Sequence, residues 1–573
     1  MDMPVLYHLT EGHLAVFLLQ LLLLLGLARG LGWLFQRIGQ PSLVGEILAG
    51  VILGPTLLGR VAPELRMVLF PDSALQYALL DAVAWIGLLL LLLSAGLEVD
   101  VSVAWRQRGP AVKIAVTDIV LPMIVAFIPA ILLPDRYVPE GTSRLLMALF
   151  LATVMTISAL PVTLKALYDL DLLKSDLGLL TLSALTINDI VGWVLFTLVL
   201  GFATHASPNL GHMLLVVVGT LAFAGFCVVL GRRWVGACIE HLQRSRLTDA
   251  GVMLTFIFCL GLLCGAITQW MGIHALFGLF LAGIMAGGTP ALSERTRGVI
   301  EQMVHALFVP VFFASIGLQL DFVKHFDLML ALLFTVVGIG GRYYGAWVGA
   351  RTTPLSKWDR VTVAIAHTPG GAMEMIVALI ALQSGLITMP VFVAVVFSAL
   401  VSSALLGPWL AWSIRRRGVV DLRRFLRRRA MRLDLADKGG DRWEALRELC
   451  LAAARETGLS FEQVHEAAAQ RERTAGTALG EGMAAPHARL EALERPLVVF
   501  GRSESGLEWN APDGLPVHLV FLVLTPEGQA DTQVQILSAL AQGLSKAETR
   551  RGLLSADEES AWSILSSLSA PVV

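Results

Sequence analysis

The chain has 573 residues, of which 56 % are hydrophobic and only 15 % are charged, and its mean hydropathy is +0.71. This composition is typical of a polytopic membrane protein and excludes a soluble class for the chain as a whole. The net charge of −2 hides an uneven distribution, because basic residues gather in particular loops and after the last apolar segment.

Apolar stretches long enough to cross a bilayer as helices recur through the first 413 residues. Residues 1–12 contain acids and no Lys or Arg, which argues against a cleaved signal peptide before the first stretch. We predict about thirteen transmembrane helices. They lie near 12–36, 41–58, 78–97, 110–134, 143–169, 178–203, 210–231, 248–270, 273–288, 296–319, 328–350, 360–385 and 389–413.

The loops between these segments differ in their basic residues. If the N-terminus is outside, the opposite loops hold little beyond Arg60, Arg66, Arg136 and Lys324. The cytoplasmic loops then receive Arg37, Arg106, Arg108, Lys174, Arg232, Arg233, Arg244, Arg246, Arg295, Arg297, Arg351, Lys357 and Arg360. The positive-inside rule therefore predicts an outside N-terminus and a cytoplasmic C-terminus. We expect the protein in a plasma (inner) membrane of bacterial type.

An Asn-Asp pair, Asn188-Asp189, lies inside the apolar segment 178–203. An ionised carboxylate near the centre of a membrane costs at least about 2.5–3.5 kcal/mol, and such residues usually face a transport pathway or a partner. We interpret Asp189 as a proton or cation site. The alternative is an Asp that is held by a buried hydrogen bond or ion pair for packing alone.

Two apolar segments contain helix-breaking residues near their middle. The segment 143–169 contains Thr156, Ser158 and Pro161, and the segment 360–385 contains Pro369 between His367 and Gly370. Proline frees a backbone carbonyl, and hydroxyl groups can satisfy the groups left by a break. Paired interrupted segments in corresponding halves point to the ion site of a transporter. Ordinary proline kinks are the alternative.

Two further charged residues lie in apolar segments. Arg342 in the segment 328–350 needs a partner if it is buried, whereas a snorkelling Arg at a helix end needs none. Glu374 and His367 are candidates for a second titrating group, and their alternative role is to satisfy freed backbone groups at the break. Because the five cysteines form no CxxC pair, we expect no metal centre and no cofactor.

Several short motifs follow one another in an order that is specific as a set. They are Gln40–Gly50 with Gly54 and Pro55, Leu93–Glu98 with Asp100, Ser158–Val162, Asn188-Asp189, His274–Gly278, Phe308–Phe313 with Gly317, and Gly371–Met375. In this order the sequence resembles the monovalent cation:proton antiporter superfamily, especially its potassium-efflux and plant cation/proton-exchanger branch. The resemblance covers roughly residues 12–413.

This resemblance implies a polytopic α-helical fold with inverted repeats and two crossing interrupted helices, broken at Pro161 and Pro369. It also implies a homodimer that exchanges Na⁺ or K⁺ for H⁺ by alternating access, a transporter and not an enzyme. The ion and proton site would comprise Thr156, Ser158, Asn188, Asp189 and Glu374. Arg342 would neutralise charge near that site. Some branches carry two adjacent Asp, so the single carboxylate at 188–189 implies electroneutral exchange. A gated potassium efflux system is the alternative.

After the last apolar segment the sequence becomes strongly basic. Nine arginines stand at 415, 416, 417, 423, 424, 427, 428, 429 and 432. We predict that this cluster binds anionic lipid, because its position beside the membrane makes nucleic acid an improbable partner. We place a transmembrane domain at 1–414, a basic linker at 415–440, which ends in Asp437–Gly440, and a soluble domain at 441–573.

The soluble domain alternates helices and strands, which predicts an α/β layer fold. Helices are expected at 442–456, 460–472, 532–545 and 558–568, and strands at 497–502 and 516–524. Gly480–Arg489, Asp513–Phe521 and Leu537–Ala541 resemble the enzyme IIA domain, fructose/mannitol type, of the sugar phosphotransferase system. This domain would regulate the transporter.

By that resemblance His487 would accept a phosphoryl group from a phosphocarrier protein, with Arg489 positioned for its oxygens. Gln533 stands where the family usually has a second His, so a regulatory binding domain without phosphorylation is the alternative. A phosphotransferase sugar permease is a further reading. It is disfavoured because Cys450 is predicted in a helix and not in the loop at a strand end that a phosphorylated cysteine needs.

Overall fold

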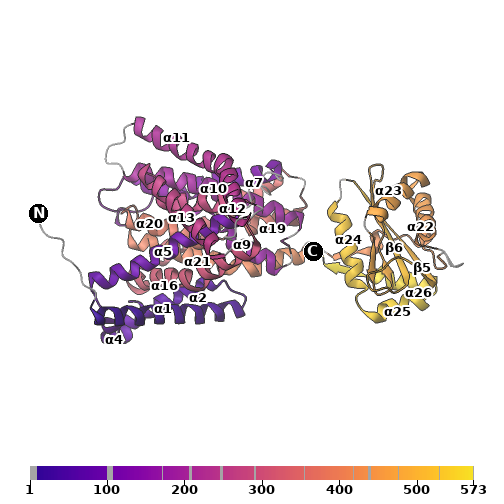
Figure 1. Ribbon diagram of the computed structural model, residues 1–573, viewed down its shortest axis with the longest axis horizontal. Helices are drawn as coiled ribbons and strands as arrows, with labels where there is room; N and C mark the ends of the chain where they lie inside the picture. Colours follow the sequence, from indigo (N-terminus) through magenta and orange to yellow (C-terminus); the bar gives the residue numbers. More distant parts are fainter. Residues whose placement is uncertain are drawn as a thin grey trace, which may run out of the picture. The chain divides into compact units, whose positions relative to one another are not determined.

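The computed structural model (Figure 1) describes residues 10–99, 108–170, 172–173, 175–204, 210–244, 250–289, 292–353, 355–416, 419–435, 441–474, 476–527 and 530–571. The chain divides into two compact units, Met1–Ala411 and Trp412–Val573. Each unit has its own hydrophobic core.

Within its described residues the membrane unit contains helices and connecting segments but no strands. Its helices are α1 (Glu11–Arg37), α2 (Ser42–Leu53), α3 (Leu58–Val61), α4 (Pro63–Leu69), α5 (Ala74–Glu98), α7 (Arg108–Ile131), α8 (Arg144–Thr156), α9 (Leu160–Asp169), α10 (Asp176–Thr204), α11 (Leu210–Phe226), α12 (Arg232–Arg244), α13 (Ala250–Trp270), α14 (Ala275–Gly287), α15 (Glu294–Met303), α16 (Val309–Gln319), α17 (Phe322–His325), α18 (Leu328–Arg351), α19 (Lys357–Ala366), α20 (Gly371–Gln383) and α21 (Met389–Arg416). Within the described residues, 12 helical spans are long and apolar enough to cross a membrane, and α14 is a shorter apolar helix. The predicted polytopic helical fold is confirmed.

Close contacts between backbones fix the helices that carry the site. Gly345 and Gly349 of α18 face α7, where an added Cβ would lie 2.9 Å from Cα of Asp118 and 2.5 Å from Cα of Ile114. Small residues let membrane helices approach each other in this way. The contact brings Asp118 of α7 and Arg342 of α18 into one part of the core.

The second unit is an α/β fold, as predicted. At the centre of its sheet, β6 (Val517–Pro526) pairs antiparallel with β5 (Leu497–Leu507) and parallel with β3 (Met483–Ala484) and β4 (His487–Leu490); β2 (Ala478–Gly480) pairs with β3. The helices are α22 (Arg442–Thr457), α23 (Phe461–Thr474), α24 (Ala530–Gly543), α25 (Ala547–Ser555) and α26 (Glu558–Ser567). They pack in two separate apolar cores. Helix α25 and the short strands β2 to β4 were not predicted from the sequence.

The segment that we predicted as a linker, 415–440, differs in the structure. Arg415 and Arg416 end α21, and residues 419–435 belong to the second unit, where β1 (Val419–Asp421) pairs antiparallel with β7 (Ser569–Pro571). Leu422, Leu426 and Ala430 recur every fourth residue between the arginines and are buried in that unit. The apolar residues therefore anchor the segment, while most of its arginines stay exposed.

Candidate ion-binding site at two crossing helix breaks

Two helices of the membrane unit are interrupted at corresponding places. The first break, Ile157–Ala159, separates α8 from α9, and the second, His367–Gly370, separates α19 from α20. Pro161 lies in the first turn of α9, where an amide donor is not needed. Pro369 lies within the second break.

The two breaks satisfy each other's backbone groups. The amide of Ala159 donates a 2.7 Å hydrogen bond to the carbonyl of Pro369. The hydroxyl of Ser158 donates to the carbonyl of His367 at 3.1 Å. Thr163 of α9 donates to the carbonyl of Ala366, the last residue of α19, at 2.7 Å. Non-helical backbone is tolerated at membrane depth only with such partners, so the predicted crossing of two interrupted helices is present.

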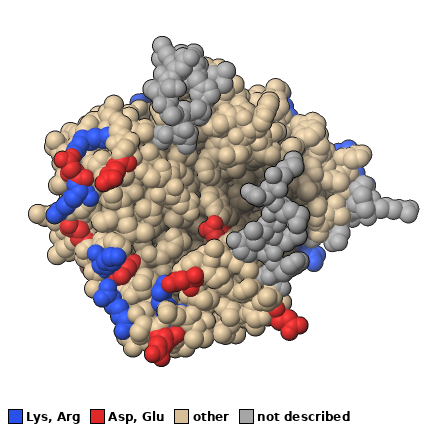
Figure 2. All heavy atoms as spheres, turned by 90° about the vertical axis from the view of Figure 1, so that its left-hand side faces the viewer, with Lys and Arg blue, Asp and Glu red and all other residues tan. Residues whose placement is uncertain are grey.

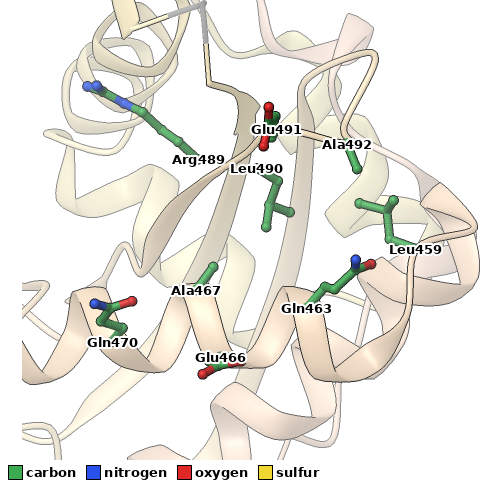
Figure 3. Close-up of a pocket in the computed structure, with 9 residues that line it drawn as sticks. All are labelled: Leu459, Gln463, Glu466, Ala467, Gln470, Arg489, Leu490, Glu491 and Ala492. Atoms are coloured by element: carbon green, nitrogen blue, oxygen red, sulfur yellow. The ribbon is translucent and has the colours of Figure 1, made fainter.

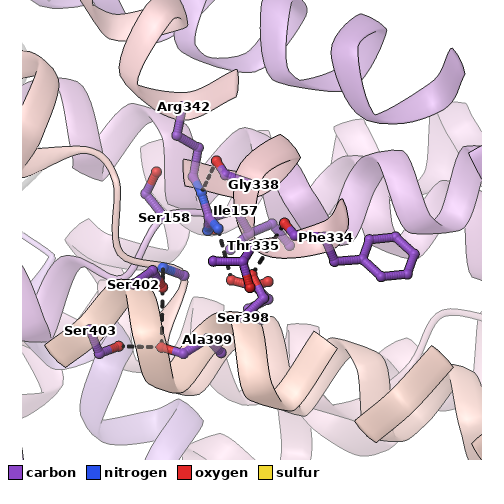
Figure 4. Close-up of polar contacts among 12 residues, drawn as sticks. Ile157, Ser158, Phe334, Thr335, Gly338, Arg342, Ser398, Ala399, Ser402 and Ser403 are labelled. Carbon is purple, nitrogen blue, oxygen red and sulfur yellow. Dashed lines mark hydrogen bonds and ion pairs between the residues drawn. The ribbon is translucent and has the colours of Figure 1, made fainter. Parts of the chain in front are cut away.

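A buried ion pair lies beside the crossing (Figure 4). Arg342 donates from Nη2 to Oε2 of Glu374 at 2.9 Å and from Nη1 to the carbonyl of Ile157 at 2.9 Å, and its Nε donates to the carbonyl of Gly338 at 3.0 Å. Both charged side chains are 0 % exposed. Arg342 is therefore a buried ion-pair partner and does not snorkel.

The ion pair depends on the absence of a side chain at Gly370. A Cβ at that position would lie 1.4 Å from Oε2 of Glu374 and 2.4 Å from Nη1 of Arg342. Gly371, the next residue, has a φ of +52°, a conformation that residues with a Cβ rarely adopt. These glycines let the break turn directly around the two charged groups.

Asn188 of α10 connects three parts of the site. Its Nδ2 donates to Oδ2 of Asp118 at 2.8 Å, and its Oδ1 accepts a 3.4 Å hydrogen bond from the amide of Ser158. Asp118 is 0 % exposed. Asp118 was not among the predicted site residues, although an ionised carboxylate in the apolar segment 110–134 is as costly as one at Asp189.

Asp189, the neighbour of Asn188 in α10, is a further buried carboxylate. It is 3 % exposed, and its Oδ1 has no hydrogen-bond partner within the described part of the chain. The same is true of Oδ1 of Asp118 and Oε1 of Glu374. Glu98, the last residue of α5, is close enough to Asp189 to interact with it electrostatically. Buried carboxylate oxygens without donors are acceptors for a proton or a cation.

The remaining predicted residues are held by their own helices. Oγ1 of Thr156 donates to the carbonyl of Ala152 at 2.8 Å. Nδ1 of His367 lies 2.8 Å from the carbonyl of Val363, and because a carbonyl only accepts, Nδ1 carries the proton. Nε2 of His367 is buried without a partner among the described residues. The structure thus joins Ser158 with Asn188 and Arg342 with Glu374 in direct contacts, while Asp189 and Thr156 lie outside those hydrogen bonds.

The second unit carries the predicted phosphorylation position. Nδ1 of His487 lies 2.9 Å from the carbonyl of Ala485, so Nδ1 is the donor and Nε2 keeps its lone pair. Burial lowers the pKa of His487; the hydrogen bond to Ala485 and the charge of Glu472 oppose this shift, while Arg471 and Arg489 add to it. Oε1 of Gln533 accepts a 2.9 Å hydrogen bond from Nε of Arg489. Gln533 therefore positions Arg489.

A pocket of about 490 Å³ lies next to this strand, between α23 and β4 (Figure 3). Arg489 and Leu490 are adjacent in β4, so their side chains leave opposite faces of the sheet. In Figure 3 Arg489 points away from Gln463 and Leu490. Arg489 is nevertheless among the residues that line the pocket, so the pocket adjoins the strand that carries His487.

A membrane unit with two crossing helix breaks beside buried carboxylates belongs to the class of secondary transporters. Comparison with known proteins agrees. Residues 21–416 match the family model described as "Sodium/hydrogen exchanger, transmembrane", and residues 428–568 match the model "Phosphoenolpyruvate-dependent sugar phosphotransferase system, EIIA 2". Because the first model covers more than half of the chain, the chain belongs to the sodium/hydrogen exchanger family. The predicted fusion of an antiporter with an enzyme IIA domain is confirmed.

Individual relatives support the same assignment. The chain is 29 % identical over 399 residues to the Na⁺/H⁺ antiporter NhaS4 of Synechocystis sp., covering 69 % of this chain and 96 % of that protein. It is 27 % identical over 409 residues to K⁺/H⁺ antiporter 1 of Saccharomyces cerevisiae, covering 70 % of this chain and 46 % of that protein, so it spans about half of that relative. The sodium proton antiporter MjNhaP1 from Methanocaldococcus jannaschii shares the fold, with a TM-score of 0.53 and 15 % identity. The match covers 70 % of this chain and 97 % of that chain.

Proposed function

We propose that the membrane unit exchanges Na⁺ or K⁺ for H⁺ by alternating access, with Asp189 as the group that carries either ion. The observation that carries this proposal is the buried carboxylate of Asp189, whose Oδ1 has no donor among the described residues. An uncompensated carboxylate is unstable in a low-dielectric core. It is neutralised either by a proton or by a cation, and the two ions therefore compete for one site.

This competition leads to exchange. The site changes its side of access while it is neutral, because moving an unpaired charge through the membrane core is expensive. Asn188, Ser158 and the carboxylate of Asp118 supply oxygen atoms close to the crossing, and oxygen is the ligand type that hard monovalent cations prefer. Figure 2 shows that one face of the membrane unit is hollowed near its centre, and we propose this hollow as the aqueous approach to the site.

We propose a positioning role for Arg342 and Glu374 rather than ion carriage. Arg342 contacts the carbonyl of Ile157 at the C-terminal end of α8, and Glu374 lies in the first turn of α20. A cation at a helix C-terminus and an anion at a helix N-terminus are both favourable. The pair therefore compensates the charges of the interrupted helices and leaves Asp189 as the exchanging group.

The cation is tested with everted vesicles that contain the full-length protein. Addition of Na⁺, K⁺ or Li⁺ to acidified vesicles is expected to raise the internal pH for at least one of these ions, and the ranking of their half-saturation concentrations identifies the substrate. An ion-induced current without any proton movement would instead support the alternative, a gated potassium efflux route.

We propose that the second unit regulates transport through His487. The lone pair on Nε2, the lowered pKa and the adjacent Arg489 support phosphoryl acceptance from a phosphocarrier protein. Phosphorylation adds about two negative charges to a unit that also carries the arginines of 423–432. Binding of a phosphotransferase partner without phosphoryl transfer is the alternative, and Gln533 favours it because a second imidazole is missing.

We propose a homodimer in a bacterial-type plasma membrane, with the N-terminus outside and the C-terminus in the cytoplasm. Among the candidate spans of the described residues, the first, Glu11–Arg37, is the least buried, because only 17 % of its most apolar stretch lies inside the protein. Its exposed leucines, together with α2, would form the interface. Single-molecule counting in bilayers tests the dimer. Anionic lipid remains the proposed partner of the arginines at 415–432.

A further inference from the structure

A second cavity, distant in sequence from the ion site, lies in the membrane unit. It has a volume of about 550 Å³ and is formed by α12 with the C-terminal end of α14. Its lining residues on and before α12 include Val229, Arg232, Arg233, Ala237 and Glu240. Because these residues recur every three or four positions, they form one stripe along the helix.

The basic side of the cavity is built around Arg232. Its Nε and Nη2 donate to the carbonyl of Gly288, at 2.9 Å and 2.5 Å, directly after the end of α14. A side chain at 288 would displace this guanidinium, because a Cβ there would lie 2.5 Å from Nε. Arg carries five N–H donors, so Arg232 retains donors for a ligand. Arg233 is exposed on the same turn.

The apolar part of the cavity precedes the arginines along the chain and lies within a membrane span. Val228 and Val229 belong to η2 (Cys227–Gly231), and Val229 is 58 % exposed. This part of the chain belongs to the candidate span Val217–Arg244. Trp234, which is 64 % exposed, lies on the next turn, and exposed tryptophans are enriched where membrane meets water. The cavity therefore runs from hydrocarbon to headgroup depth.

We propose that this cavity binds one anionic phospholipid, with its phosphate at Arg232 and Arg233 and its acyl chains along Val228 and Val229. The lining is complementary in charge to an anionic headgroup, because its acidic residue, Glu240, is already paired with Arg244 at 3.6 Å. Basic pockets at the cytoplasmic ends of membrane helices suit such headgroups. A soluble phosphate would use the arginines but not the apolar side. The proposal concerns a site separate from the ion pathway and goes beyond the exchange function.

The site is tested by counting phosphatidylglycerol that stays bound to the full-length protein in native mass spectrometry, against phosphatidylcholine. Arg233→Gln is expected to weaken retention about fivefold, which corresponds to about 1 kcal/mol. Ala237→Leu, which fills the cavity and keeps both arginines, is expected to reduce retention similarly. Arg351→Gln removes an exposed arginine that lies over Trp347, and this control is expected to retain lipid like the wild type.

Three results would overturn the proposal. Equal retention of phosphatidylglycerol by Arg233→Gln and Arg351→Gln would show that Arg233 does not contact the lipid. Wild-type retention in Ala237→Leu would show that lipid binds by general surface charge and not in the cavity. If inorganic phosphate displaces all phosphatidylglycerol, and phosphatidylcholine is retained as well as phosphatidylglycerol, the ligand is a soluble anion.

Discussion

Nη2 of Arg342 lies 2.9 Å from Oε2 of Glu374, and neither side chain has exposed surface. The two residues are on different helices, α18 and α20, and the carbonyl of Ile157 from the first break accepts a further bond from the same guanidinium. This contact ties both interrupted helices to α18.

Removing one partner of this pair is expected to destabilise the protein strongly. Glu374→Gln leaves the guanidinium of Arg342 buried without a counter-ion, and breaking a buried pair in this way costs about 3–5 kcal/mol. We expect a clearly lower melting temperature in detergent, with partial recovery in the double variant Arg342→Gln/Glu374→Gln. Glu64→Gln on α4, an exposed position, is the control. An unchanged melting temperature for Glu374→Gln would contradict the structural role of the pair.

Gly370 offers a test of the geometry of the second break. Gly370→Ala places a Cβ 1.4 Å from Oε2 of Glu374, so we expect loss of transport together with lower thermal stability. Gly340→Ala is the matched control, because an added Cβ there meets no atom within 4 Å and alanine favours the helix. Transport at the wild-type rate in Gly370→Ala would show that the break has a different conformation in the working protein.

We predict that exchange is electroneutral, because Asp189 is the single carboxylate of the Asn-Asp pair. A membrane potential imposed on proteoliposomes without a pH gradient should then drive no cation uptake. Asp118, whose Oδ2 accepts a hydrogen bond from Asn188, is the residue that could add a second exchanged charge. If the potential drives uptake in the wild type and no longer does so in Asp118→Asn, the prediction fails and Asp118 carries a second charge.

Phosphoryl acceptance at His487 is expected to tolerate mild acidity. Burial lowers the pKa of His487 below its ordinary value of 6.5, so the neutral nucleophile still predominates at pH 6.5 and is lost only as the pH falls further. Labelling with phosphoenolpyruvate and phosphocarrier should persist from about pH 7.5 to about pH 6.5. His487→Ala should abolish it, whereas His465→Ala on α23 should not. Labelling of His487→Ala at the wild-type level would refute the assignment.

The regulatory role requires a different measurement. A chain that ends at Arg416, the last residue of α21, removes the α/β fold of the second unit, including the segment 419–435 that packs into it. We expect its exchange rate or pH profile to differ from that of the full chain, and phosphocarrier with phosphoenolpyruvate to affect only the full chain. Identical profiles for both chains would leave the second unit without a role in transport.

The sequence predicts most of the site because charged and helix-breaking residues are conspicuous in apolar segments. Asp189, Arg342, Pro161 and Pro369 were recognisable for this reason. Asp118, which follows Thr117 in an apolar segment, satisfied the same criterion and was not among the predicted site residues.

The pairing of Arg342 with Glu374 could not be predicted with equal certainty, because the contact joins separate helices and depends on how the break folds. The segment 419–435 was misjudged for another reason. Its arginines dominate the composition, while Leu422, Leu426 and Ala430 decide where it packs. Local composition indicates solvation, whereas the spacing of a few apolar residues determines the fold.

The central claim is that Asp189 carries both ions, and the most direct test is Asp189→Asn in purified, reconstituted protein. The amide has nearly the same volume as the carboxylate, so the substitution removes only the titrating charge. Asp81→Asn, at an exposed position on α5, is the control. We predict that Asp189→Asn inserts and folds but shows no cation-dependent proton flux, while Asp81→Asn exchanges like the wild type. Cation-dependent proton flux in folded Asp189→Asn protein would contradict the account.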